Sequence, residues 1–278
     1  MPHQRFPLAV LLFAACCLTS ITSLSAADQG PIIVAHRGGA YEYEENTMEG
    51  FRACYERGIR GYETDIRMTK DGVLVVLHDD SLDRTHQATG PVEEKTVAEL
   101  AEVVTKKGQK LLYLDELLEF FADKPDVYLE LEMKTKNKKL YPDGRIAEYC
   151  QKLHKAATAQ QPADSTYVFT SFDERPLKAI HEIDAKAPFM LIASKPCSTE
   201  FIERAKELGT NRMACRIEGT SRAAIEEAHK NGMIVSCWPG RGVNDYYMAL
   251  GLGIEVHCTD IPTVIQSVKE QLPEVAAK

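Results

Sequence analysis

Short apolar runs alternate with amphipathic segments along most of the chain after residue 30. Eight runs have the length and composition of strands, at residues 32–35, 61–67, 127–133, 167–170, 189–193, 212–217, 233–238 and 254–259. Segments with helical periodicity lie near residues 47–57, 114–122, 146–159, 174–183, 199–208, 221–230, 244–250 and 262–271. Strands that are apolar on both faces are typical of parallel sheets covered by helices. Eight strand–helix units predict an α/β fold, the TIM (β/α)8 barrel, with a doubly wound open sheet as the alternative.

One stretch after the second predicted strand interrupts this alternation. Thr69-Lys70-Asp71-Gly72 has the composition of a tight turn, and a short apolar run at 73–77 and a polar segment to about residue 110 follow it. Long insertions on a compact scaffold often carry function. We therefore expect a small insertion, at about residues 73–110, that lies over the mouth of the barrel.

The N-terminus differs in composition from the rest of the chain. Arg5 is the only charged side chain before Asp28, residues 8–18 are all apolar, and small residues precede Asp28. This order is typical of a secretory signal peptide, and 11 apolar residues are too few to span a bilayer as a helix. We expect residues 1–27 to be a signal peptide and residues 28–278 to form the barrel of an exported protein, periplasmic or secreted. A minority alternative is a lipoprotein in which Cys16 carries the lipid.

Charge and cysteine content narrow the class of protein further. Of the 278 residues, 33 are Lys or Arg and 41 are Asp or Glu, which gives a formal charge of −8. An acidic chain is a poor nucleic-acid binder, because that affinity comes largely from basic side chains on phosphates. The six cysteines after residue 27 form no C-x-x-C pair, so zinc and thioredoxin-like sites have no support. We expect most of them to be small buried residues, and a small molecule to be the ligand.

Acidic side chains recur on two of the predicted strands. Glu63 and Asp65 are two residues apart, so their side chains point to the same side of the second strand, and Glu130 and Glu132 repeat this spacing on the third. Carboxylates gathered in one cavity repel each other unless a cation neutralises them. Oxygen ligands favour a hard cation, so we expect Ca²⁺ or Mg²⁺.

Two histidines end apolar strands that lead toward the same predicted mouth. His36 follows the first strand and His78 follows the short run of the insertion. Two imidazoles with pKa values near neutrality can serve as one acid and one base. Arg37 and Lys134 would supply positive charge beside a divalent ion, a combination that suits a phosphate ester.

With these residues in place, the chain closely resembles the glycerophosphodiester phosphodiesterase family from residue 32 to residue 262. The ordered motifs that carry the resemblance are His36-Arg37-Gly38, Glu45-Asn46-Thr47, Glu63-x-Asp65, Thr69-Lys70-Asp71-Gly72, His78-Asp79, Leu82-Asp83-Arg84-Thr85, Glu132-x-Lys134, Ser171-Phe172, Trp238 and Thr259-Asp260-x-Pro262. The resemblance implies a TIM barrel with a small insertion. It also implies metal-dependent hydrolysis of glycerophosphodiesters to sn-glycerol 3-phosphate and an alcohol, as part of lipid and glycerol metabolism.

The same resemblance implies a role for each site residue. It makes His36 and His78 the acid/base pair, places a divalent ion on Glu63, Asp65 and Glu132, and puts the substrate against the side chains Arg37, Lys134 and Trp238. The sequence leaves open which histidine is the acid, and whether water attacks directly or a cyclic phosphate forms first. Two alternatives remain: a phospholipase D-like enzyme acting on intact or lyso-phospholipids, and a non-catalytic glycerophosphodiester-binding protein.

Three places depart from the pattern of that family. Glu44 stands where a proline is usual, Pro239-Gly240 follows Trp238 in place of a Thr-Val-Asn run, and Glu255 and His257 replace Asp and Ile. These changes leave the acid/base and metal positions intact. We expect them to alter the side of the pocket that receives the leaving group.

Overall fold

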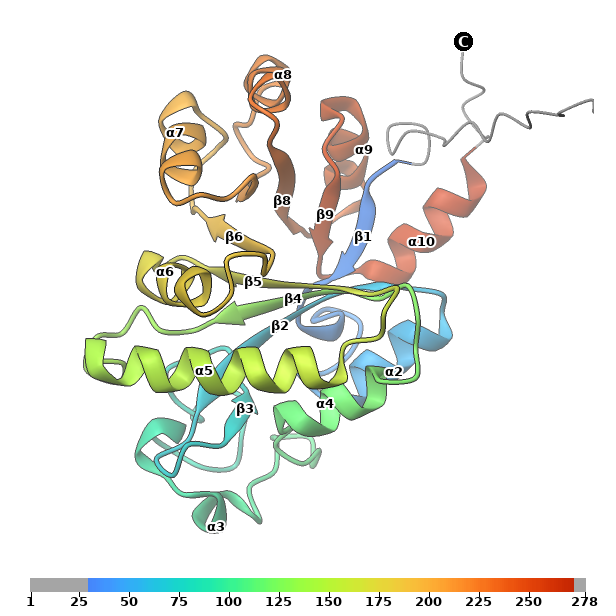
Figure 1. The fold of residues 1–278 in the computed structure, drawn as a ribbon. Coiled ribbons are helices and arrows are strands. Elements are labelled where there is room, and N and C mark those ends of the chain that lie inside the picture. Colours follow the sequence, from blue (N-terminus) through green and yellow to red (C-terminus); the bar gives the residue numbers. More distant parts are fainter. Residues whose placement is uncertain (1–29, 273–278) are drawn as a thin grey trace, which may run out of the picture.

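A closed barrel of eight parallel strands forms the centre of the molecule (Figure 1). The computed structural model describes residues 30–272, so the predicted signal peptide lies outside the described residues. The strands follow the order β1-β9-β8-β7-β6-β5-β4-β2, and β1 also pairs with β2 to close the ring. The predicted TIM barrel is therefore confirmed, and the open-sheet alternative is wrong.

All eight predicted strands are present, with bounds that differ by a few residues at most. They are β1 (Ile32–Ala35), β2 (Gly61–Met68), β4 (Tyr128–Met133), β5 (Thr166–Ser171), β6 (Phe189–Ile192), β7 (Arg212–Arg216), β8 (Ile234–Gly240) and β9 (Val256–Thr259).

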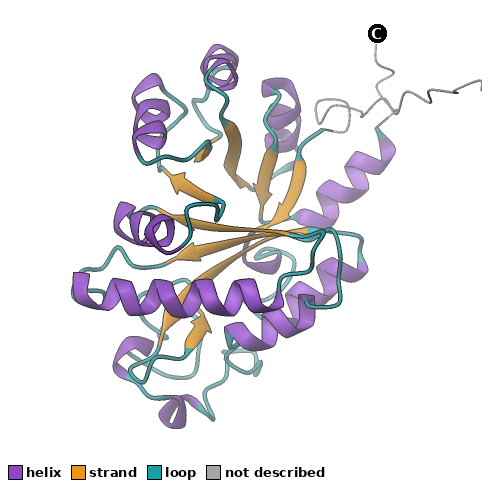
Figure 2. Cartoon of the chain, in the orientation of Figure 1, coloured by secondary structure: helices purple, strands orange, loops and turns teal. Residues whose placement is uncertain are grey.

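Helices surround the barrel and cover its outer face (Figure 2). They are α2 (Met48–Glu56), α4 (Leu114–Phe121), α5 (Asp143–Gln160), α6 (Glu174–Ile183), α7 (Thr199–Glu207), α8 (Arg222–Lys230), α9 (Val243–Leu252) and α10 (Pro262–Gln271). Within the described residues, no helix combines the length and apolar character needed to cross a membrane.

Gly61 allows the ring to close. It lies where β2 meets β1, opposite Val34. A Cβ atom at this position would lie 2.4 Å from the carbonyl oxygen of Ile33 and 2.9 Å from a methyl group of Val34. Because real Cβ atoms do not approach backbone oxygens so closely, a side chain here would push the first and second strands apart.

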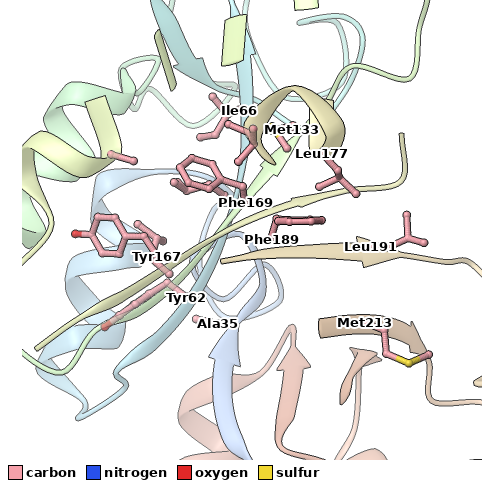
Figure 3. Close-up of a cluster of buried hydrophobic side chains, with 14 of the residues drawn as sticks. Ala35, Tyr62, Ile66, Met133, Tyr167, Phe169, Leu177, Phe189, Leu191 and Met213 are labelled. Atoms are coloured by element: carbon pink, nitrogen blue, oxygen red, sulfur yellow. The ribbon is translucent and has the colours of Figure 1, made fainter. Parts of the chain in front are cut away.

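Two hydrophobic clusters occupy the two faces of the barrel wall. The larger one packs the outward residues of the strands against the helices, and Figure 3 shows part of it around Tyr62, Phe169 and Phe189. The smaller cluster fills the barrel interior with one or two residues from most of the strands: Val34, Tyr128, Val168, Met190, Ile192, Ala214, Val256 and Cys258. The six cysteines of the described residues are buried free thiols, in agreement with the sequence interpretation.

The insertion forms a small core of its own beside β2. Its strand β3 (Leu74–Val76) pairs antiparallel with β2 outside the ring, and η2 (Val92–Glu94) and α3 (Val97–Leu100) follow (Figure 1). Arg67 of β2 is almost fully buried between the two parts, where it donates to Glu93 at 2.9 Å and to the carbonyl oxygens of Leu77 and His78. This buried arginine therefore joins the insertion to the barrel next to His78.

His257, on the outer face of the barrel wall, makes the stability of the folded protein depend on pH. Its ring is fully buried under Tyr246, and neither ring nitrogen has a hydrogen-bond partner within the described residues. Burial lowers the pKa of His257 to about 4, although the charge of Asp245 acts in the opposite direction. An unfolded histidine titrates near 6.5, so between pH 6.5 and about 4 the unfolded chain binds a proton here that the folded chain does not.

Replacing His257 with leucine is expected to flatten the acid-side fall in stability. In the parent protein the free energy of unfolding should fall by roughly 2 to 3 kcal/mol between pH 7 and pH 4.5 on account of this one residue. The His229→Gln variant, at an exposed position, serves as the control. Urea denaturation at both pH values measures the difference, and an equal loss in the parent and His257→Leu proteins would contradict the prediction.

Candidate active site

The first site residues lie in a tight turn directly after β1. His36 and Arg37 form the single 3-10 turn η1 (His36–Gly38), and Arg37 has a φ of 51°, in the left-handed region that non-glycine residues seldom adopt. This conformation aims the Arg37 backbone N–H at Glu63, to which it donates at 2.9 Å. The turn therefore places His36 and Arg37 at the C-terminal end of the barrel, where TIM barrels carry their active sites.

Strand register brings the acidic side chains together. Asp65 of β2 is paired with Glu132 of β4, and Glu63 is paired with Glu130 one layer deeper in the barrel. One carboxylate oxygen from each of Glu63, Asp65 and Glu132 lies within 4.8 Å of the others, and all three residues are buried. The predicted meeting of these three carboxylates is thus present, while Glu130 lies below them and accepts a hydrogen bond from Tyr128 at 3.0 Å.

Cationic and amide groups surround this cluster. Lys134 lies 2.7 Å from Glu132 and 3.4 Å from Asp65, and the Arg37 guanidinium lies 3.5 Å from Asp65 on the other side. Asn46 donates to Asp65 at 2.8 Å. The cap of α2 is the next residue, Thr47, because Asn46 is turned inward to the carboxylate.

Burial and charge separate the acidities of the two neighbouring carboxyls. Burial, with the negative charges of Asp65 and Glu132, raises the pKa of Glu63 well above its usual value. Burial alone would also raise the pKa of Asp65, but the positive charges of Lys134, His78 and Arg37 outweigh it and lower that pKa. The nearby cations therefore offset the charge of Asp65, while Glu63 remains in a site where an additional negative charge is unfavourable.

Each of the two histidines is oriented by a carboxylate. His36 Nδ1 lies 2.5 Å from Asp260, and His36 Nε2 lies 3.9 Å from Glu63. His78 Nδ1 lies 2.7 Å from Asp79. An ionised carboxylate can only accept a hydrogen bond, so both rings carry their proton on Nδ1 when neutral. In each ring Nε2 is then left with a free lone pair, which is the arrangement a general base requires.

A single pocket contains both histidines and opens at the C-terminal end of the barrel. Its lining residues are His36, Arg37, Glu63, His78, Glu130, Glu132, Phe172, Ile192, Ala214, Ser236, Trp238 and Cys258. Phe172 and Trp238 form one wall, with their rings edge to face at 5.6 Å. The pocket is continuous with a groove that contains Lys134, so all eight residues singled out from the sequence line this region or hold its charged groups.

Several polar residues of the site had no assigned role at the sequence level. Asp260, Asp79 and Asn46 belong to quoted motifs, but only the structure places them on His36, His78 and Asp65. Asp260 directly follows a strand, and this signal was also what singled out His36. Ser236 of β8 lines the pocket as well, and nothing in an apolar strand distinguishes one serine from its neighbours.

Trp238 lines the pocket, but none of the residues that depart from the family pattern is among its lining residues. Glu44 accepts a hydrogen bond from Thr105 of the insertion. Glu255 lies at the opposite end of the barrel, where it contacts His229, and His257 faces the helices. The expectation that Glu255 and His257 reshape the pocket is therefore wrong.

The barrel carries two histidines, an oxygen-rich acidic cluster and cations around one pocket, which is the equipment of a phosphoric ester hydrolase. The family model described as "Glycerophosphoryl diester phosphodiesterase family" matches residues 36–264. The chain belongs to this family.

Relatives that carry the family's name agree with that assignment, and a solved structure shares the fold. The chain is 28% identical over 256 residues to a glycerophosphodiester phosphodiesterase of Caldanaerobacter subterraneus subsp. tengcongensis, covering 86% of this chain and 98% of the relative. It is 24% identical to a glycerophosphodiester phosphodiesterase of Bacillus subtilis, covering 90% and 92%. An Oleispira antarctica phosphodiesterase, solved in complex with the product sn-glycerol-3-phosphate, shares the fold with a TM-score of 0.78 at 21% identity, covering 88% and 99%.

Proposed function

We propose that this protein hydrolyses glycerophosphodiesters to sn-glycerol 3-phosphate and an alcohol, with His36 and His78 as the acid/base pair. The observation that carries the proposal is that both histidines face one pocket beside the acidic cluster. Membership of the family and the names of the relatives support the choice of substrate.

We further propose that Glu63, Asp65 and Glu132 hold one divalent cation, Ca²⁺ or Mg²⁺. The donor set fits such an ion, because it consists of three carboxylates and hard cations prefer oxygen ligands. Glu63 Oε1 is buried without a hydrogen-bond partner in the described residues, as expected of an atom that binds a ligand. Asp65 Oδ1 likewise has no hydrogen-bond partner there, although the Lys134 ammonium lies 3.4 Å away. When bound, a divalent cation supplies Lewis-acid polarisation of the phosphoryl oxygens and offsets negative charge.

Side chains of the protein would bind the phosphate and transfer the protons. Arg37 and Lys134 flank the cluster and would bind the phosphate oxygens that extend beyond it. One neutral imidazole would accept the proton of the attacking hydroxyl at Nε2, and the other, protonated on both ring nitrogens, would donate its Nε2 proton to the departing alkoxide. Asp260 and Asp79 hold the two rings in place, and Phe172 and Trp238 exclude water from one side.

An assay of purified residues 28–278 tests this function directly. Glycerophosphocholine, glycerophosphoethanolamine, glycerophosphoinositol and a lysophospholipid are each offered with Ca²⁺, Mg²⁺ or EDTA, and release of sn-glycerol 3-phosphate is measured. We expect hydrolysis of the water-soluble diesters that depends on the cation. Cleavage of the lysophospholipid alone would favour the phospholipase D-like alternative, and tight binding without turnover would favour a binding protein.

The exposed aromatic residues give little support to the phospholipase D-like alternative. Such an enzyme would need exposed aromatic residues around the mouth. Of four tyrosines that could serve, Tyr246 of α9 is buried and Tyr43 packs against the core, while Tyr41 and Tyr247 are exposed.

We also propose export, because residues 1–27 have the charge, apolar core and small-residue order of a signal peptide. N-terminal sequencing of the protein recovered from an exporting host should begin at Asp28. A mature protein that retains Met1 in the cell interior, or begins at a lipidated Cys16, would contradict it.

A further inference from the structure

The space around the acidic cluster has two connected parts. The barrel part contains His36, Glu63, Ser236 and Trp238, and the groove part extends outward along the β2, β4 and β5 ends. The two parts share His78, Glu132 and Phe172, so the phosphate position beside the cluster lies at their junction. A phosphodiester held there would place one substituent in each part.

The barrel part suits a small polar group of fixed structure. Ser236 is 1% exposed, and its Oγ has no hydrogen-bond partner within residues 30–272; the same is true of Trp238 Nε1. Buried polar atoms are rarely left unpaired without a ligand to satisfy them. The glycerol hydroxyls, which are common to all substrates of the proposed function, match these two groups.

The groove receives whatever substituent remains, and its charges are almost all paired. Arg67 binds Asp80 at 2.6 Å, and Arg84 binds Asp79 at 2.6 Å. Asn137 also donates to Asp80, and Lys134 is held by Glu132. The exception among the described groove residues is Lys136, which is exposed and has no ion-pair partner within residues 30–272.

We propose that the alcohol part of the diester occupies this groove and that Lys136 selects alcohols carrying negative charge over those carrying positive charge. The proposal rests on the function proposed above and names the substrate class of that site. Each of the two groove aspartates is ion-paired with an arginine, and these arginines also contact Glu93 and Glu45. Lys136 is therefore the groove side chain whose charge is left without an ion-pair partner within residues 30–272.

The expected size of the effect follows from the exposure of Lys136. Ion pairs at exposed positions are worth up to about 1 kcal/mol, which corresponds to roughly fivefold in kcat/KM. The preference should weaken at high salt, because exposed charges are screened over about 8 Å at physiological ionic strength.

Three glycerophosphodiesters with different head-group charges test the proposal. They are glycerophosphocholine (positive), glycerophosphoinositol (neutral) and glycerophosphoinositol 4-phosphate (negative). For the parent protein we expect kcat/KM to be highest for the anionic substrate and lowest for the choline ester. Lys136→Gln should reduce the anionic-to-cationic ratio about fivefold, and Lys136→Glu should invert the preference. The neighbouring exposed Lys138, which does not line the groove, provides the matched control Lys138→Gln, with an unchanged ratio.

A Ser236→Ala variant checks the assignment of the two parts. Removing the Ser236 hydroxyl should lower kcat/KM for all three substrates by a similar factor, because all three share the glycerol moiety. A ratio that stays the same in Lys136→Gln and Lys136→Glu, or a Ser236→Ala effect confined to one head group, would overturn the inference while leaving the hydrolase function in place. Absence of turnover with every diester would instead refute the proposed function.

Discussion

Replacing His36 with alanine, or His78 with alanine, should lower kcat by roughly 100-fold or more, the usual scale of a general acid or base. Each ring has a free Nε2 at the pocket, and no other histidine of residues 30–272 lines it. The fold should remain intact, because both rings lie at strand ends at the mouth and not in the packed wall. Steady-state kinetics on a glycerophosphodiester, with circular dichroism as a check of folding, gives the measurement.

His229→Ala is the matched control, since that histidine lies on α8 beside Glu255 at the far end of the barrel. Asp260→Asn is a finer variant. It keeps a hydrogen bond to His36 but lets the amide donate, which would move the ring proton to Nε2 and block the free lone pair. Its kcat should fall while KM changes little. Near-normal turnover in His36→Ala or His78→Ala would remove that residue from the mechanism.

The repeating part of the fold could be predicted from sequence because each strand–helix unit carries its own pattern. A short apolar strand followed by a polar turn occurs eight times. Only a few folds can bury so many strands that are apolar on both faces. Pairing of β1 with β2 depends on a contact that no pattern records, the close approach of Gly61 to the backbone of Ile33. The short helix α3 was missed because four residues are too few to show helical periodicity.

The candidate site was predictable to the extent that its residues sit at strand ends. Spacing by two on β2 and β4 already placed Glu63, Asp65 and Glu132 on inward faces, and barrel register then brought them together. The supporting contacts depend on tertiary geometry. Asp260 reaches His36 across 224 positions, and Asp80 is paired with Arg67 of β2. Sequence spacing carries no information about which carboxylate remains free of a partner.

The double change Glu63→Gln and Asp65→Asn should abolish the response to divalent cations and reduce turnover to near background. A ligand that binds only the folded state raises its stability by an amount that grows with ligand concentration, so the parent protein should show a Tm that rises with added Ca²⁺ or Mg²⁺. The amides keep the size of the side chains and the hydrogen bond from Arg37 but remove two of the three negative charges. Thermal unfolding across a cation titration, together with isothermal titration calorimetry, provides the test.

The Tm measured in EDTA distinguishes the loss of a metal site from simple misfolding of the variant. Burial and the charges of Asp65 and Glu132 raise the pKa of Glu63, which means that the ionised cluster destabilises the folded protein at neutral pH. Glu63→Gln alone should therefore unfold at an equal or higher Tm than the parent in EDTA, and still lose its response to the cation. Glu130→Gln, one layer deeper and outside the trio, should keep that response. Activity that survives both EDTA and the double change would refute the metal site, because hydrolysis would then need neither the cation nor two of its three proposed ligands.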